Sequence, residues 1–128
     1  MARPAAVRTE AAPAPFQGAP YSQAIKAGDF VFVSGQLGLK PGDTEISGTI
    51  QEQTEQIFEN LGAILEAAGS GLDRIVKTTV FLVSLGDFQA MNEVYATHVG
   101  EKRPARSTVE IAALPSGALV EIEAIATV

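Results

Sequence analysis

The feature that most constrains the fold of this chain is a pair of segments that are apolar at consecutive positions. Residues 30–33 read Phe-Val-Phe-Val, and residues 75–83 read IVKTTVFLV, a run rich in β-branched side chains. β-Branched residues favour strands, and successive strand residues point to opposite faces of a sheet. Both segments are therefore predicted to be central strands that are covered on both faces.

Two stretches have the apolar spacing of amphipathic helices. Thr49 and Glu52 form the pattern S/T-x-x-E, in which each side chain satisfies backbone groups of the first helical turn. The apolar stripe that follows ends before Gly69, a residue type that commonly terminates helices. Asp87 can cap a second helix. The inner stripe of this second helix consists of Phe88, Met91, Tyr95 and Val99.

The remaining segments complete an α+β fold. Two late strands are predicted at about residues 105–112 and 119–127, joined by the turn sequence LPSGA. The order β-β-α-β-α-β-β gives a mixed sheet with two helices packed on one face. No third helix is available for the other face, whose central strands are also apolar. Exposed apolar surface of this kind is typical of an interaction site, so self-association is expected.

The chain divides at about residue 15. Residues 1–15 are rich in proline and alanine and are predicted to be a disordered N-terminal tail, with a transit peptide rich in arginine and alanine as the alternative. Residues 16–128 have the length of a single domain. No apolar run approaches the roughly 20 residues that span a bilayer, and the opening residues lack the apolar core of a signal peptide. A cytoplasmic protein without membrane partners is therefore expected.

Composition excludes several classes of site. The sequence has no cysteine and one histidine, His98. These counts rule out disulfides, thiolate metal sites and a cysteine nucleophile, and no metal site is expected. The net charge of −6 disfavours nucleic acid as a partner, because non-specific binding of nucleic acid comes largely from neutralising phosphates.

The last two predicted strands place polar residues on defined faces. With a period of two, Arg106, Thr108 and Glu110 share a face of the first strand. Glu121 and Glu123 share a face of the second strand, inside the apolar run ALVEIEAIATV. A carboxylate in such a run is costly unless it is paired or hydrated, and Arg106 is a candidate partner. From the pattern alone, however, a solvated charge is the simpler interpretation of each residue.

Four segments carry a family resemblance. They are APYSQAIKAGDFVFVSGQ at 19–36, EAAGSGLDRIVKTTVFL at 66–82, DFQAMNEVYATHV at 87–99, and PARSTVEIAAL followed by VEI at 104–122. In this order and spacing they resemble the RidA, or YjgF-type, family of reactive-intermediate enamine/imine deaminases. The resemblance covers the chain from about residue 15 to its end, without a large insertion.

The resemblance implies a fold and an activity. The fold would be a chorismate-mutase-like α+β domain assembled as a homotrimer, with substrate sites in three clefts between subunits. The activity would be hydrolysis of enamines and imines of the 2-aminoacrylate and 2-iminopropanoate type to 2-keto acids and ammonia. Such intermediates leak from pyridoxal-phosphate dehydratases, so the role would be control of metabolite damage. The RidA-type protein itself uses no cofactor.

The resemblance also assigns site residues. Arg106 falls on the arginine that binds the substrate carboxylate, and Glu121 falls on the glutamate of VEI; these two would be the catalytic residues. A guanidinium binds a carboxylate through two parallel hydrogen bonds, and a glutamate can orient a water molecule and accept its proton. Thr108 stands where many members have cysteine. The substrate-binding set is completed by Tyr21, Ser34, Asn92 and Thr108.

Two other function classes stay open on the sequence. A non-catalytic regulatory trimer that binds a small carboxylate would also need Arg106, here as the sensor of a keto acid. An endoribonuclease is the third class, because some relatives are described as such. The net charge of −6 and the lack of a basic stripe argue against the nuclease.

Overall fold

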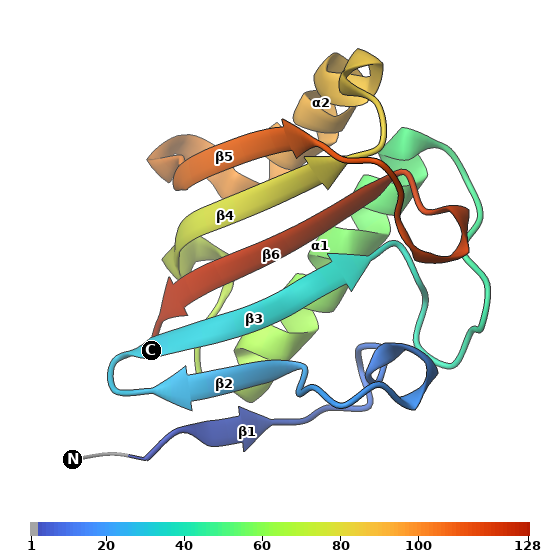
Figure 1. Ribbon diagram of the computed structural model, residues 1–128. Helices are drawn as coiled ribbons and strands as arrows, with labels where there is room; N and C mark the ends of the chain where they lie inside the picture. Colours follow the sequence, from blue (N-terminus) through green and yellow to red (C-terminus); the bar gives the residue numbers. More distant parts are fainter. Residues whose placement is uncertain (1–2) are drawn as a thin grey trace.

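Six strands form one mixed sheet in the computed structural model, which describes residues 3–128 (Figure 1). The order across the sheet is β1-β2-β3-β6-β4-β5; β4 and β5 are parallel, and every other pair is antiparallel. Both helices, α1 and α2, lie on the same face, as predicted. The bounds are β1 Ala5–Val7, β2 Ala24–Ala27, β3 Phe30–Leu37, α1 Ile50–Ala67, β4 Ile75–Leu82, α2 Phe88–Val99, β5 Ala105–Glu110 and β6 Val120–Thr127.

Helix α1 begins at the predicted capping box. The Thr49 hydroxyl accepts a hydrogen bond from the Glu52 backbone N–H at 3.1 Å, and the Glu52 carboxylate accepts one from the Thr49 backbone N–H at 2.9 Å. The backbone N–H of Thr49, followed by the Thr49 side chain, lowers the pKa of Glu52. At the other end, Gly69 adopts a φ of 81°, which favours glycine and ends the helix.

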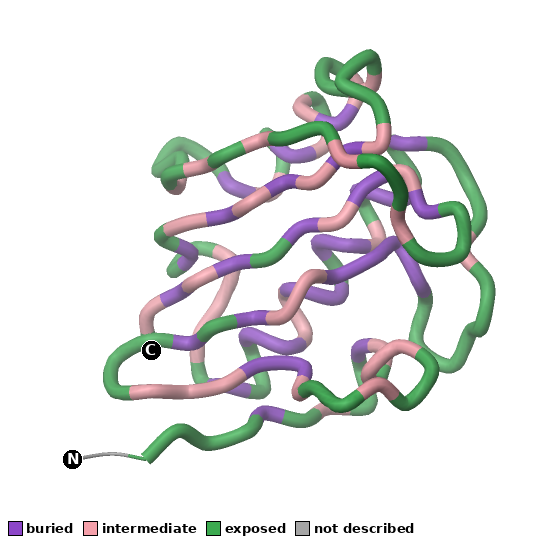
Figure 2. Tube along the Cα trace, viewed as in Figure 1, coloured by how far each residue is buried: buried purple, intermediate pink, exposed green. Residues whose placement is uncertain are grey.

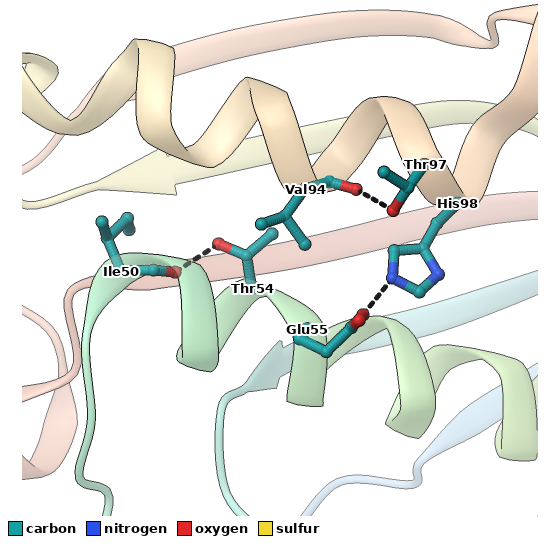
Figure 3. A network of polar contacts seen from close by, with 6 residues as sticks. All are labelled: Ile50, Thr54, Glu55, Val94, Thr97 and His98. Atoms are coloured by element: carbon teal, nitrogen blue, oxygen red, sulfur yellow. Dashed lines mark hydrogen bonds and ion pairs between the residues drawn. The ribbon is translucent and has the colours of Figure 1, made fainter.

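The two helices contact each other through one aromatic cluster. The His98 ring of α2 stacks on Phe58 of α1, with ring centroids 4.7 Å apart and planes 1° from parallel. Tyr95 meets the same Phe58 ring edge-on at 5.3 Å. The His98 ring nitrogen Nε2 also forms a hydrogen bond with the Glu55 carboxylate of α1 (Figure 3). His98 thus holds α2 against α1. Within residues 3–128, neither helix combines the length and apolar character needed to cross a membrane.

The sheet has one covered and one open face. Burial alternates along the strands (Figure 2), and Val120 and Ile122 of β6 are fully buried beneath the helices. On the other face, Phe30 and Phe32 are 42% and 45% exposed, and Val109 is 41% exposed. The central strands are apolar on both faces, as predicted, but this single chain covers only one of them.

The prediction of a disordered N-terminal tail is wrong for the described part of that segment, residues 3–15; residues 1 and 2 lie outside the described residues. β1 pairs antiparallel with β2, with Ala6 opposite Ile25. Ala12 is 3% exposed and belongs to the core. Small residues suffice here, because the backbone polar groups of the segment are satisfied by β2 and by a buried glutamine side chain, Gln23.

Candidate active site

A cavity of about 650 Å³ lies at one end of the open sheet face, and we call it the Glu121 cavity. It brings together three residues predicted for the site: Tyr21 before β2, Ser34 of β3 and Glu121 of β6. These three residues give the cavity polar groups. The lining also includes apolar residues, namely Pro13, Phe16, Leu37, Leu39 and Pro115.

A bulge in β3 places the Glu121 carboxylate. The register between β3 and β6 shifts between Val33 and Gln36, so Ser34 and Gly35 lie at the irregularity. A Cβ atom at Gly35 would stand 2.6 Å from Oε1 and 2.7 Å from Cδ of Glu121. Glycine at this position therefore lets the carboxylate lie directly against the strand backbone. In the sequence VSGQ, a glycine inside a strand pattern is the signal that could have identified Gly35 as a residue of the site.

The surroundings of Glu121 favour its protonated form. Burial is the larger cause and the neighbouring charge of Glu123 is the second, and together they raise the pKa of Glu121 above its usual value. A carboxyl group with a raised pKa can exchange protons closer to neutral pH. Glu121 thus combines access to a cavity with the electrostatics of a general acid–base group.

Two hydroxyl groups of the Glu121 cavity are oriented by the backbone. The Tyr21 hydroxyl accepts a hydrogen bond from the Phe16 N–H at 2.6 Å, which leaves its own proton free for a ligand. The Ser34 hydroxyl donates to the Ser22 carbonyl at 2.6 Å, which leaves its oxygen free to accept. The cavity therefore presents one hydroxyl donor and one hydroxyl acceptor beside the Glu121 carboxylate.

A second cavity, of about 460 Å³, lies between α2 and β5, and we call it the Arg106 cavity. The Arg106 guanidinium carbon stands 4.7 Å from the centroid of the Tyr95 ring and 5.4 Å from that of Phe88. In the part of the chain that the structure describes, no carboxylate forms an ion pair with Arg106. Aromatic rings thus hold the guanidinium by cation–π contacts, while its hydrogen-bond donors remain available to an anion.

The partners of Arg106 are themselves fixed by the core. The Tyr95 hydroxyl shares a hydrogen bond of 2.6 Å with Thr78, which lies beside Arg106 in the parallel pair of β4 and β5. Asn92, on α2, lines the same cavity. Its Oδ1 atom is buried and has no hydrogen-bond partner. A buried amide oxygen without a partner is unusual, and it adds an unsatisfied acceptor close to the guanidinium.

The two cavities lie on opposite faces of the same sheet. Arg106 points toward α2, whereas Glu121 alternates with the buried Val120 and Ile122 and faces away from the helices. The candidate pairing of Arg106 with Glu121 or Glu123 is therefore not formed within one chain. Thr108 shares the face of Arg106 but lines neither cavity.

Strained backbone positions occur next to both cavities. Among residues 3–128, three residues other than glycine have a positive φ: Gln17 at 54°, Arg103 at 36° and Ser116 at 53°. Gln17 lines the Glu121 cavity, Ser116 follows Pro115 of that cavity, and Arg103 lines the Arg106 cavity. Such conformations cost free energy and gather at functional sites.

Comparison with known proteins shows the family and the fold of the chain. The family model described as Endoribonuclease L-PSP matches residues 9–128. The chain belongs to the RidA, or YjgF-type, family. A RutC family protein of Pyrococcus horikoshii is 54% identical over 119 residues, covering 92% of this chain and 93% of the relative. The RidA fold is shared too: the crystal structure of RidA from an Antarctic Psychrobacter species superimposes with a TM-score of 0.92 at 45% identity, covering 97% and 99% of the two chains.

A further relative has a name that states a reaction. It is the 2-iminobutanoate/2-iminopropanoate deaminase of Mus musculus, which is 45% identical over 114 residues, or 88% of this chain and 84% of the relative. The family therefore includes proteins named as imine deaminases, whereas others carry the names RutC or endoribonuclease.

Proposed function

We propose that this RidA family member hydrolyses small 2-imino acids, and their enamine tautomers, to 2-keto acids and ammonia. The observation that carries the proposal is the Arg106 guanidinium, which is fixed by two aromatic rings and has no carboxylate partner among the described residues. Such a group is prepared to bind the carboxylate that every 2-imino acid carries. The deaminase name of the mouse relative supports the same reaction.

The complete site would combine the Glu121 cavity of one subunit with the Arg106 cavity of another. Arg106 and Glu121 face opposite sides of one sheet, so a small substrate can contact both only across a subunit boundary. The open face, with its exposed Phe30 and Phe32, offers apolar surface for that contact. A closed homotrimer would contain three such sites, because each subunit would supply its Arg106 cavity to one neighbour and its Glu121 cavity to the other.

The proposed reaction needs few side chains. Arg106 binds the substrate carboxylate and thereby fixes the neighbouring imine carbon, which is electrophilic. Glu121 orients a water molecule and accepts a proton as the water oxygen bonds to the carbon of the protonated imine, giving a neutral tetrahedral amino alcohol. Glu121 returns that proton to the nitrogen, and the hydroxyl group then gives its proton to Glu121 as the C=O bond forms and the C–N bond breaks. The keto acid leaves, and ammonia takes this last proton from Glu121 and leaves as ammonium. Positioning and general acid–base help supply the acceleration.

Substitution of Arg106 tests the proposal. Imines generated in the assay from a dehydratase acting on serine give pyruvate as product. We expect Arg106→Ala to lower kcat/KM by about 100-fold, since two charge-assisted hydrogen bonds are lost. Arg106→Lys keeps the positive charge but loses the planar guanidinium group, so its kcat/KM should lie between those of the parent and of Arg106→Ala. Arg74→Ala, at an exposed arginine that lines neither cavity, is the matched control.

The outcomes separate the alternative functions. A parent protein that releases pyruvate no faster than buffer would contradict the deaminase. Saturable binding of pyruvate by that inactive parent, lost in Arg106→Ala, would instead identify a regulatory carboxylate-binding protein. If Arg106→Ala is as fast as the parent, the assignment of Arg106 is wrong although the activity stands.

A further inference from the structure

The N-terminal segment, residues 9–16, is held by one buried side chain. Gln23 is 4% exposed, and its Nε2 atom donates to the carbonyls of Thr9, Ala12 and Pro13 at 3.0, 3.2 and 2.8 Å. Its Oε1 atom accepts a hydrogen bond from the Thr9 N–H at 2.7 Å. The amide thus uses both of its ends on backbone groups 10 to 14 residues away in sequence.

The segment has little other support. Cavities of about 420 and 400 Å³ lie along its sides, in addition to the Glu121 cavity. Ala12 is its one core residue, and the Phe16 N–H contact with Tyr21 fixes its far end. Within residues 13–16, the Gln23 amide holds the end at Pro13 and the Tyr21 hydroxyl holds the end at Phe16, so loss of the Gln23 contacts frees one end of this stretch.

The segment is also one wall of the Glu121 cavity. Pro13 and Phe16, together with Leu39, line the same cavity as the Glu121 carboxylate. A substrate whose reacting carbon lies at Glu121 must direct an apolar side chain away from the polar groups. The N-terminal wall is the surface that such a side chain would meet.

We propose that Gln23 is a positioning residue that sets the size of substrate side chain the site prefers. It does so by fixing residues 13–16 as the wall that covers the distal carbons of the side chain. This inference rests on the proposed function and deepens it. A methyl side chain is too short to reach residues 13–16, so kcat/KM for the smallest substrate should depend on Gln23 least. For substrates with longer apolar side chains, kcat/KM should depend on Gln23 most.

The experiment compares 2-imino acids with increasingly long apolar side chains, generated from the amino acids by an amino acid oxidase. In Gln23→Met, which keeps length and apolar volume but loses all four hydrogen bonds, the segment is released. We expect kcat/KM to fall about fourfold for each methylene no longer covered. The loss should appear in KM, and the value for 2-iminopropanoate should stay within about twofold of the parent value.

Two further variants keep the test decisive. Phe16→Ala removes the wall at a partly exposed position and leaves the Gln23 hydrogen bonds intact, so it should reproduce the same loss of size preference. Gln53→Met is the matched control: Gln53 is 3% exposed, also bonds to loop backbone, and lines neither site cavity. It should lower stability without changing the preference for side-chain length.

A structural readout accompanies the kinetics. Hydrogen exchange of the Thr9 amide, which donates to Gln23, should accelerate in Gln23→Met and stay slow in Phe16→Ala. Unchanged ratios of kcat/KM across the panel in both variants would overturn the inference while leaving the deaminase intact. A parent that hydrolyses none of the imines would instead contradict the proposed function itself.

Discussion

Gly35 is the residue on which the position of the Glu121 carboxylate depends. An added Cβ would stand 2.6 Å from Oε1 and 2.7 Å from Cδ of Glu121, distances that real Cβ contacts do not show. Either the glutamate side chain or the bulge in β3 must move. The requirement for glycine at this position comes from one particular side chain rather than from backbone conformation.

We predict that Gly35→Ala lowers kcat of the proposed deaminase more than it lowers stability. The carboxylate leaves its position over the strand, and a misplaced general base commonly costs about 10²-fold. Gly62→Ala is the control, because its Cβ would meet Leu72 at an ordinary 3.5 Å and alanine favours helix α1. The measurements are steady-state kinetics and thermal unfolding. Equal kcat in the two variants would remove Glu121 from the mechanism.

The proximity of Glu121 and Glu123 predicts how the rate of the proposed deaminase depends on pH. Since burial and the charge of Glu123 raise the pKa of Glu121, the acid limb of the pH–rate profile should lie above the usual range of a glutamate. Glu123→Gln removes the like charge and should move that limb to lower pH. In Glu121→Gln the limb should disappear together with most of the activity. An acid limb unmoved by Glu123→Gln would show that another group limits the rate.

The same pKa shift has a consequence for stability. A carboxyl group whose pKa is higher in the folded than in the unfolded chain favours folding at low pH, and this contribution is lost as the pH rises through the folded pKa. Glu121→Gln should therefore unfold at a higher temperature than the parent at neutral pH. The difference should vanish below the ordinary pKa of glutamate. A loss of activity accompanied by a gain in stability is typical of a functional residue.

At the level of elements, the N-terminus of α1 gives a separate prediction. Thr49→Ala removes the hydroxyl that accepts the Glu52 N–H, and the loss of such a cap costs about 1 kcal/mol of unfolding free energy. Thr97→Ala is the matched control, because its hydroxyl bonds to the Val94 carbonyl inside α2 and caps nothing (Figure 3). Denaturant titration should separate the two variants, and equal midpoints would contradict the capping role.

Elements with strong local patterns are the ones that the sequence predicts correctly. The capping box and the apolar stripe locate α1, and the β-branched run locates β4, because short-range physics decides both. β1 has only three residues, Ala5–Val7, and no local pattern. It forms because β2 pairs with it, and Gln23 holds the residues that follow it, long-range contacts that composition cannot reveal.

For the candidate site too, the sequence predicts the features set by local patterns and not those set by long-range contacts. Period two correctly groups Arg106 with Thr108 and Glu121 with Glu123, because alternation is a property of each strand. Which group faces the helices is decided by the packing of α2 on β5, a long-range contact. The sequence therefore could not show that Arg106 and Glu121 lie on opposite faces, nor that Phe88 and Tyr95 hold the guanidinium.

On the scale of the whole molecule, one sheet face is left uncovered by this chain. Phe30, Phe32 and Val109 are each more than 40% exposed on the face without helices, and Glu121 lies at one end of it. The hydrophobic effect favours burial of this face in an assembly. In the proposed site, the same assembly would also supply Arg106 of another subunit to the Glu121 cavity, so assembly and completion of the site would be coupled.

Mixing two inactive variants tests that coupling. If each site takes Arg106 from one subunit and Glu121 from its neighbour, a trimer that contains both Arg106→Ala and Glu121→Gln subunits has one intact site. Equal co-expression should then restore about a quarter of the parent activity, since about three quarters of the trimers are mixed and each has one active site in three. If both residues acted within one subunit, every site would lack one of them and no activity would return. Mixing Arg106→Ala with Arg106→Lys is the control, because no combination of these two subunits rebuilds an intact site.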